Sequence, residues 1–237
     1  MKIYHLHGWN ISYDKAREIQ NRLRERLALS DKDVPSTIQT IAGADISYEK
    51  STNTFFAAVV VLDFATMEII EQVSSIGTTD FPYIPGLLTF REGPILLEAF
   101  LKLTSSPDII MFDGQGIAHP RGIGLASHMG LFLDTPSIGC GKTRLVGSYE
   151  EPGNEAGDYS PLLFKDEITG AVLRTKRNVK PVFISPGHKI GFEKAIAITL
   201  ASCRGYRLPE PTRKAHIAAG EIRLRHGHQM VHTSADV

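Results

Sequence analysis

Three carboxylates in this sequence lie at the ends of expected elements or in the middle of an expected strand, where folding can bring them together: Asp45, Glu92 and Asp113. Lys142 and His216 add a cation and an imidazole from later segments. Carboxylate oxygens without cysteine ligands suit Mg²⁺ or Mn²⁺. Acids gathered around such ions hydrolyse phosphodiesters by in-line attack of water. These five residues therefore indicate metal-dependent phosphodiester chemistry.

The densest polar cluster of the chain begins at Asp113. It follows residues 109–112, four apolar residues in a row, which is the pattern of a strand buried on both faces. A carboxylate at the carboxyl end of such a strand lies where open α/β sheets bind ligands. Gly114, Gly116 and Gly122 remove side chains where the backbone would approach a ligand. A capping aspartate in a flexible turn is the alternative, but the density of polar residues favours a site.

Asp45 and Glu92 each leave two interpretations open. A charge in the middle of a strand most often lies on the exposed face, but Ala44 and Ile46 give Asp45 apolar neighbours. A buried carboxylate there has to be paired, protonated or bound to a cation. Glu92 is the third residue of an expected helix capped by Thr89, so it is either a capping-box residue or a metal ligand.

A rigid loop precedes this helix. Pro82 and Pro85 stiffen the loop and hold Tyr83 and Ile84 out from the body, and Gly86 closes it. An aromatic residue presented in this way suits a wedge that enters a base stack. A buried loop anchor is the alternative interpretation.

Lys142 follows a short expected strand, residues 136–140, and lies between Gly141 and Thr143. These three residues are similar to the end of a phosphate-binding P-loop, but position 136 is proline where that motif requires glycine. The segment is therefore no P-loop, but Lys142 at the end of a strand can still bind a phosphate through its point charge.

The composition sets the class of protein. The 237 residues are enough for one large α/β domain. Lysine plus arginine and aspartate plus glutamate are balanced at 26 each, so a surface that binds nucleic acid has to be local. The two cysteines form no C-x-x-C pair, which disfavours a disulfide framework or a structural zinc site. We expect a soluble, cytoplasmic protein, since we see neither a signal peptide nor an apolar stretch long enough for a membrane span.

Hydrophobic periodicity predicts the elements that position the candidate residues. Apolar residues at three- and four-residue steps predict a helix capped by Ser12. Short links between the next three apolar segments favour an antiparallel meander. The expected strands are 38–48, 55–62, 67–76, 109–112, 136–140 and 181–185, with a hairpin around 167–170, and the expected later helices are 90–103, 123–133 and one through 196–200.

Two polar segments remain beside these elements. Arg174, Lys176, Arg177 and Lys180 form the densest basic run, which either follows a nucleic-acid backbone or belongs to a solvated edge strand. From about residue 226 the chain is polar and rich in histidine, and we expect residues 226–237 to be a flexible tail. No linker divides the chain, so residues 1–237 are expected to form a single domain.

The order of the expected elements, a meander followed by helix–strand–helix–strand, is that of a ribonuclease H-like domain. We therefore expect an α/β fold with a mixed sheet, in which an antiparallel three-strand meander and parallel strands are flanked by helices. In such a domain the acids gather on the first and fourth strands. The most distinctive motifs are Pro-Tyr-Ile-Pro at 82–85 and Asp-Gly-x-Gly-x-x-His-Pro-Arg at 113–121.

With these motifs the sequence resembles the endonuclease V family, over roughly residues 10–225. The segments that carry the resemblance are Ile41–Tyr48, Phe81–Pro94, Asp113–Gly130, Pro136–Gly147 and Val179–His216. The resemblance implies that Asp45, Glu92 and Asp113 bind the metal. It further implies that Lys142 stabilises the scissile phosphate and that His216 lies beside the attacking water. The implied wedge is Pro82, Tyr83, Ile84 and Pro85, the implied lesion pocket is Gly86, Leu88 and Gly114, and the implied supports of the site and its phosphates are His119 and Arg121.

The activity implied by the resemblance is that of a Mg²⁺-dependent DNA-repair endonuclease, with Mn²⁺ able to substitute. Such an enzyme recognises deoxyinosine, which is deaminated adenine, and hydrolyses the second phosphodiester bond 3′ to the lesion, leaving 3′-hydroxyl and 5′-phosphate ends. We expect it to act as a monomer.

Two alternative functions remain. One is an endoribonuclease specific for inosine in RNA, which differs by contacts to the 2′-hydroxyl that a sequence does not reveal. The other is a non-catalytic nucleic-acid binder. Three acids placed near phosphate argue against a binder, which needs positive charge instead.

Overall fold

The computed structural model describes the backbone of residues 1–233 and the side chains of residues 1–227. Eight strands form one mixed sheet in the order β3-β2-β1-β4-β5-β8-β7-β6. The strands are β1 (Thr40–Glu49), β2 (Thr54–Asp63), β3 (Ile69–Thr78), β4 (Ile109–Phe112), β5 (Ser137–Gly141), β6 (Tyr159–Phe164), β7 (Glu167–Leu173) and β8 (Val182–His188). The helices are α1 (Tyr13–Arg24), η1 (Asp31–Asp33), α2 (Leu88–Leu101), α3 (Leu125–Leu133), α4 (Phe192–Ala201) and α5 (Glu210–Thr233).

The strand pairing confirms the expected mixed sheet. β1, β2 and β3 form an antiparallel meander, and β4 and β5 extend it with two parallel pairings. β8 then pairs antiparallel with β5, and β7 and β6 continue in the antiparallel sense. Because β1, β4 and β5 run in one direction, their carboxyl ends meet at the same edge of the sheet.

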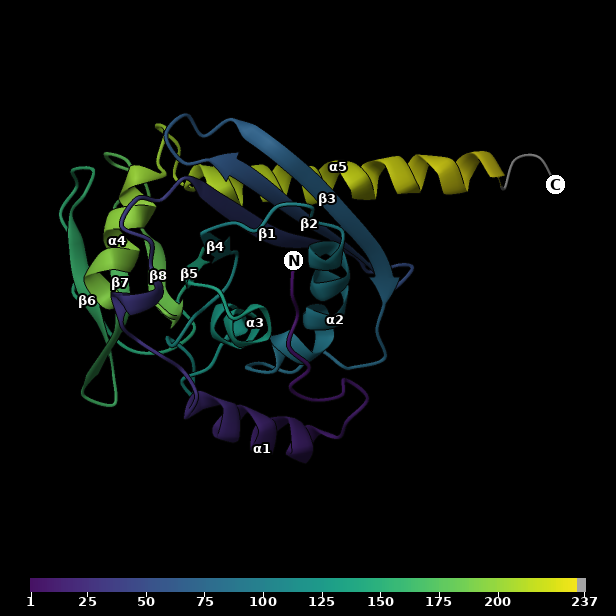
Figure 1. Ribbon diagram of the computed structural model, residues 1–237, viewed down its shortest axis with the longest axis horizontal. Coiled ribbons are helices and arrows are strands. Elements are labelled where there is room, and N and C mark those ends of the chain that lie inside the picture. The colour runs from purple at the N-terminus through teal and green to yellow at the C-terminus, as the bar shows by residue number, and fades with distance from the viewer. Residues whose placement is uncertain (234–237) are drawn as a thin grey trace.

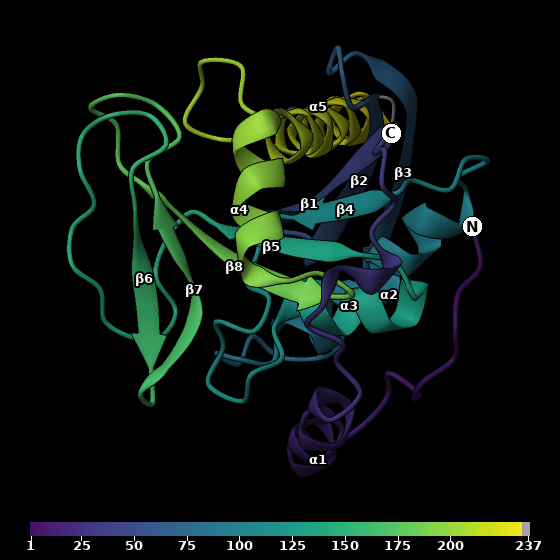
Figure 2. The same ribbon diagram turned by 60° about the vertical axis from the view of Figure 1, so that its left-hand side comes forward.

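Helices cover both faces of this sheet (Figures 1 and 2). α4 and α5 pack on one face, and α2 and α3 pack on the other. α1 lies outside α2 and α3, where its buried residues join the apolar residues of the loops before those helices. Ser12 caps α1 as predicted, because its hydroxyl accepts from the Lys15 N–H. No described helix is both long and apolar enough to cross a membrane.

Alternation along β1 decides which face receives each side chain. Ile41 belongs to the core under α4 and α5, whereas Ala42 and Ala44 belong to the core under α2 and α3. Asp45 is four residues after Ile41 and therefore points toward α5. Its side chain is only 8% exposed, so the interpretation of Asp45 as a surface charge is wrong.

The start of α5 lies directly on β1 at Gly43. A Cβ atom at Gly43 would be 1.8 Å from the carbonyl oxygen of Pro211. No side chain fits in this space, so glycine is what allows α5 to rest on the strand. The contact fixes α5 over the segment that ends in Asp45.

The beginning of α2 differs from the expectation. The helix starts at Leu88, and its N-cap residue Leu87 makes no side-chain capping bond. Thr89 is thus a buried residue within the first turn rather than the cap. The capping-box interpretation of Glu92 is therefore wrong, since Glu92 is the fifth residue of the helix.

Two segments in the second half also differ. The hairpin turn is at Lys165 and Asp166, both with positive φ, so residues 167–170 lie within β7. The backbone expected to form a flexible tail from about residue 226 is helical as far as Thr233, and residues 234–237 lie outside the described part. Glu221 and Arg225 form an i,i+4 ion pair on the exposed side of this helix, which supports its helical conformation.

Both outer strands of the sheet have contacts on their open side. At β3, the Lys102 ammonium donates to the carbonyl oxygen of Ser74. At β6, Ser148 exchanges two backbone hydrogen bonds with Leu163. Pro161, two residues before Leu163, has no N–H to donate.

Candidate active site

The carboxyl edge of the parallel strands brings the predicted site residues together. Asp113 directly follows β4, and its N–H donates to the Ala44 carbonyl at 3.0 Å, which places it beside Asp45 of β1. Lys142 directly follows β5. His216 is in the second turn of α5, above β1. Four of the five residues thus come from neighbouring elements, as the expected fold requires.

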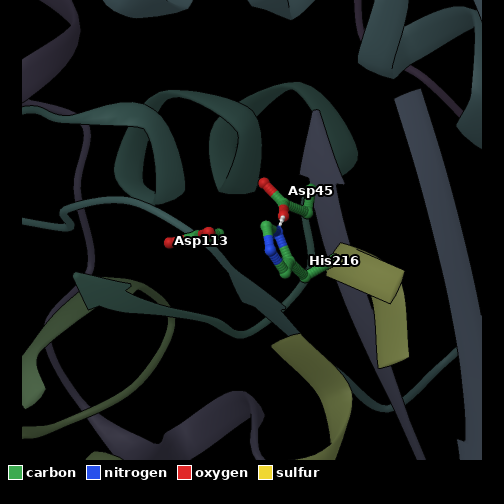
Figure 3. Close-up of side chains that lie close together, drawn as sticks. All are labelled: Asp45, Asp113 and His216. Atoms are coloured by element: carbon green, nitrogen blue, oxygen red, sulfur yellow. Dashed lines mark hydrogen bonds and ion pairs between the residues drawn. The ribbon is translucent and has the colours of Figure 1, made fainter. Parts of the chain in front are cut away.

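Asp45, Asp113 and His216 form a compact group (Figure 3). Each of them offers one ligand atom, and these atoms lie within 4.8 Å of one another. His216 Nδ1 is 2.7 Å from Asp45 Oδ2, and the Lys142 ammonium pairs with Asp113 while lying 3.4 Å from His216 Nδ1. Since a carboxylate only accepts, His216 Nδ1 carries the hydrogen in the bond to Asp45, and Nε2 has no partner among the described residues.

Burial and like charges shape the ionisation of the acids. Burial, and then repulsion by Asp113, raises the pKa of Asp45 to about 6, against the attraction of Lys142 and the hydrogen bond from His216. Burial, and then the charges of Asp45 and Asp113, raise the pKa of Glu92 to about 8. Glu92 is therefore electrostatically coupled to the acids, although it lies outside their compact group.

The donor set fits a divalent cation. Two carboxylates and an imidazole converge, and burial, followed by the repulsion from Asp113, raises the pKa of Asp45. A positive charge between the two acids offsets this repulsion. Lys142 already contributes one such charge. Hard oxygen ligands with one nitrogen suit Mg²⁺ or Mn²⁺ better than soft metals.

A cavity of about 320 Å³ opens beside this group. Its lining includes Asp113 and Lys142 from the acid group. All three residues implied for a lesion pocket, Gly86, Leu88 and Gly114, also line it. The predicted pocket residues are thus brought to one cavity that borders the candidate metal site.

The Pro-Tyr-Ile-Pro loop forms the rim of this cavity. Tyr83, Ile84 and Pro85 line the cavity, whereas Pro82 does not. The Tyr83 side chain is 69% exposed, so it is no buried anchor. Phe81 anchors the loop instead, because it packs in the core shared with α1.

Three donors converge behind the cavity on the carbonyl oxygen of Gly86. They are Gln20 Nε2 at 3.0 Å, His119 Nε2 at 2.9 Å and an Arg121 guanidinium nitrogen at 2.5 Å. Burial lowers the pKa of His119 to about 4, so the ring is neutral at pH 7. His119 Nδ1 accepts from the Arg121 N–H, which leaves the hydrogen on Nε2 for Gly86.

This geometry places His119 and Arg121 as supports of the Gly86 turn, where φ is +78°. Phosphate binding by either residue stays a prediction.

Sequence reasoning missed Gln20 and Gln115. Gln20 is 1% exposed on α1 and also accepts from the Arg121 Nε at 2.5 Å. Gln20 lies on the buried face of α1 with Ala16, Ile19 and Leu23. A polar amide on this otherwise apolar face is the feature of the sequence that could have indicated its role. Gln115 lines the cavity and donates to the Thr143 carbonyl, which ties the β4 end to the segment after β5.

Comparison with known proteins shows the family of this chain. The family model described as Endonuclease V matches residues 21–217. Endonuclease V from Dehalococcoides mccartyi is 49% identical over 222 residues, which cover 94% of this chain and 99% of that protein. The structure of endonuclease V from Bacillus subtilis is 34% identical with a TM-score of 0.92, covering 97% of this chain and 100% of that one.

A third relative was solved with nucleic acid. Endonuclease V from Ciona intestinalis, in complex with a 24mer DNA containing an inosine followed by a ribo-adenosine, is 26% identical with a TM-score of 0.78. The match covers 90% of this chain and 98% of that one. These likenesses confirm the expected ribonuclease H-like α/β fold. The chain therefore belongs to the endonuclease V family and is a deoxyribonuclease.

Proposed function

We propose that this protein is a Mg²⁺-dependent endonuclease that recognises deoxyinosine in DNA and hydrolyses the second phosphodiester bond 3′ to it. The observation that carries the proposal is the cavity of about 320 Å³ beside the group of Asp45, Asp113 and His216. An inosine-containing DNA bound to the Ciona intestinalis relative supports the choice of substrate. The proposal treats the chain as one ribonuclease H-like domain that acts as a monomer in the cytoplasm.

Each polar residue of the site has a proposed part in the reaction. Asp45 and Asp113 would hold a divalent cation, with Glu92 as a further carboxylate nearby. When bound, such a cation polarises the phosphate and offsets its charge. Lys142 would stabilise the negative charge that develops on the scissile phosphate. His216 Nε2 would accept a proton from the attacking water, because its Nδ1 is held by Asp45.

Recognition of the base is proposed to use backbone groups in the cavity. Three donors take up the Gly86 carbonyl, and the Gly86 N–H has no partner among the described residues. An N–H donor suits the keto oxygen of hypoxanthine and opposes the amino group of adenine. Deaminated adenine also pairs weakly, so its extrusion costs less than that of a normal base.

End-labelled oligonucleotides would test the proposal. One DNA and one RNA, each with a single inosine, are incubated with the protein and Mg²⁺, Mn²⁺ or EDTA, beside matched strands with adenine. We expect Mg²⁺-dependent nicking of the inosine DNA at the second bond 3′ to the lesion. Absence of nicking in Mg²⁺ would refute the proposal, and faster cleavage of the RNA would assign the activity to inosine in RNA.

The wedge gives a first mutational prediction. Tyr83→Ala is expected to weaken binding of an inosine duplex about tenfold or more, since stacking on an aromatic ring contributes about 1–3 kcal/mol per base. The melting temperature should stay unchanged, because Tyr83 is 69% exposed. Titration of duplex and single-stranded inosine DNA measures both effects, with the larger loss expected on the duplex.

Tyr13→Ala, which removes another exposed tyrosine, is the control. An unchanged preference for inosine in Tyr83→Ala would remove Tyr83 from the wedge.

Gln20 gives a second prediction. Gln20→Ala removes one donor from the Gly86 carbonyl and the acceptor of the Arg121 Nε. We expect the free energy of unfolding to fall by about 1–3 kcal/mol, the cost of buried polar groups left unpaired. Because the Gly86 turn loses support, the ratio of kcat/KM for inosine over adenine DNA should fall as well. Arg22→Ala, on the exposed side of the same helix, should change neither quantity.

A further inference from the structure

A second hollow borders the candidate active site on the side of β8. It is an open groove of about 820 Å³, and it shares Lys142, Thr143 and Arg144 with the cavity proposed for the base. The strand order β4-β5-β8 fixes the arrangement: the cavity lies at the end of β4, Lys142 at the end of β5, and the groove at the start of β8. Lys142 thus stands between the two hollows.

The groove is positively charged, although the chain as a whole carries no net charge. Four cations and one acid line it: Lys142, Arg144, Lys180, Arg207 and Glu151. The acid Glu151 is paired with the guanidinium of Arg174 at 2.9 Å. The excess of positive charge in the groove is therefore not cancelled by its own acid.

Arg207, which lines the groove, and Arg174, which pairs with Glu151, both have structural roles. Arg207 donates to the carbonyl oxygens of Lys142, Lys180 and Pro181, which fixes the floor of the groove beside the catalytic lysine. Arg174 is buried and donates to the Gly153 carbonyl as well as to Glu151. Of the two interpretations of the basic run, the one in which Arg174 follows a nucleic-acid backbone is therefore wrong.

Arg144 and Lys180 are left as the cations available to a ligand. Both are exposed, and neither forms an ion pair among the described residues. The Arg144 guanidinium lies over the ring of Tyr149, 5.7 Å from its centroid, so it is held at the wall of the groove. Two unpaired cations along a groove provide electrostatic contacts for successive phosphates.

The direction of the substrate strand follows from the order of the hollows. This step rests on the proposed function, in which the base enters the cavity and the scissile phosphate, 3′ to it, lies at Lys142. A strand that runs from the cavity to Lys142 runs in the 5′ to 3′ direction and, if continued, reaches the groove. We propose that the groove binds the phosphodiester backbone of DNA on the 3′ side of the scissile bond, with Lys180 and Arg144 as its contacts.

Truncated substrates and one pair of lysine variants test this proposal. Inosine DNA that extends about ten nucleotides beyond the scissile bond, enough for several phosphate contacts, is compared with DNA that ends one nucleotide beyond it. Lys180→Ala is expected to lower kcat/KM for the long substrate by roughly three- to tenfold and to reduce the slope of log kcat/KM against log salt by about one. The short substrate should be cleaved as by the unaltered protein. Lys176→Ala removes an exposed cation of the same segment that does not line the groove, and should have no effect.

The outcomes separate this inference from the proposed function. Nicking of both substrates at the expected bond, with an equal effect of Lys180→Ala on each or with none, overturns the groove assignment and leaves the endonuclease in place. In a second pair of substrates, with long and short 5′ flanks, an effect of Lys180→Ala that depends on the 5′ flank would reverse the strand direction and also overturn the groove assignment. Failure of the unaltered protein to nick either substrate overturns the proposed function, and the groove assignment with it.

Discussion

Asp113→Asn is expected to abolish cleavage of inosine DNA while binding of that DNA persists. Asparagine keeps the size of the side chain but removes one of the two carboxylates that converge with His216. It also removes the partner of the Lys142 ammonium. We expect kcat to fall about a thousandfold or more, a loss of roughly 4 kcal/mol of transition-state stabilisation. Single-turnover cleavage in Mg²⁺ and a binding titration of the same oligonucleotide measure the two effects.

The fold should tolerate this substitution. Repulsion by Asp113 contributes to the raised pKa of Asp45, so a neutral residue relieves a strain between like charges. The melting temperature should therefore not fall. Asp166→Asn, in the exposed turn between β6 and β7, is the matched control and should keep full activity. Cleavage retained by Asp113→Asn would exclude Asp113 from the metal site.

The second large effect is expected at a residue that carries no chemistry. In Gly43→Ala, the new Cβ would meet the Pro211 carbonyl at 1.8 Å, so α5 has to move away from β1. His216 moves with α5, and a displacement of about 1 Å at a reacting group can cost a hundredfold in rate. We also expect the free energy of unfolding to fall by about 1–3 kcal/mol, as for other overpacked sites. Urea denaturation and cleavage assays, run below the unfolding midpoint, measure the two losses.

Gly220→Ala, on α5 itself, provides the matched comparison for Gly43→Ala. A Cβ at Gly220 meets nothing within 4 Å, so alanine there should raise the stability by about 1 kcal/mol through helix propensity. Activity should be unchanged. If Gly43→Ala were as active and as stable as Gly220→Ala, the contact between β1 and α5 would not be what positions His216.

The acid group was predictable because strand ends are readable in a sequence. The apolar residues 109–112 define β4 and place Asp113 at its carboxyl end, and the same logic places Lys142 after β5. The side of the sheet that Asp45 faces was not predictable. Both faces of β1 carry apolar residues near Asp45, so the sequence is compatible with Asp45 on either face of the sheet. Only the packing of α5 on Gly43 shows which face Asp45 occupies.

Other features depended on contacts far apart in the chain. Gln20 reads as one polar residue of an amphipathic helix, and its role follows from Gly86 and Arg121, which are 66 and 101 residues away. Arg174 reads as part of a basic run, yet carbonyl groups of the loop before β6 surround it. In both cases the side chain is buried by segments whose approach no local pattern encodes.

The contacts on the outer strands bear on how this sheet avoids joining a neighbour. An open strand edge offers unpaired N–H and C=O groups and can template aggregation. On β6, both backbone groups of Leu163 are taken by Ser148, and Pro161 offers no donor. On β3, the Ser74 carbonyl is occupied by Lys102. One proline, one short bridge and one lysine thus make the two edges of the sheet poorer templates for a neighbouring strand, without the barrel closure that other β-rich proteins use.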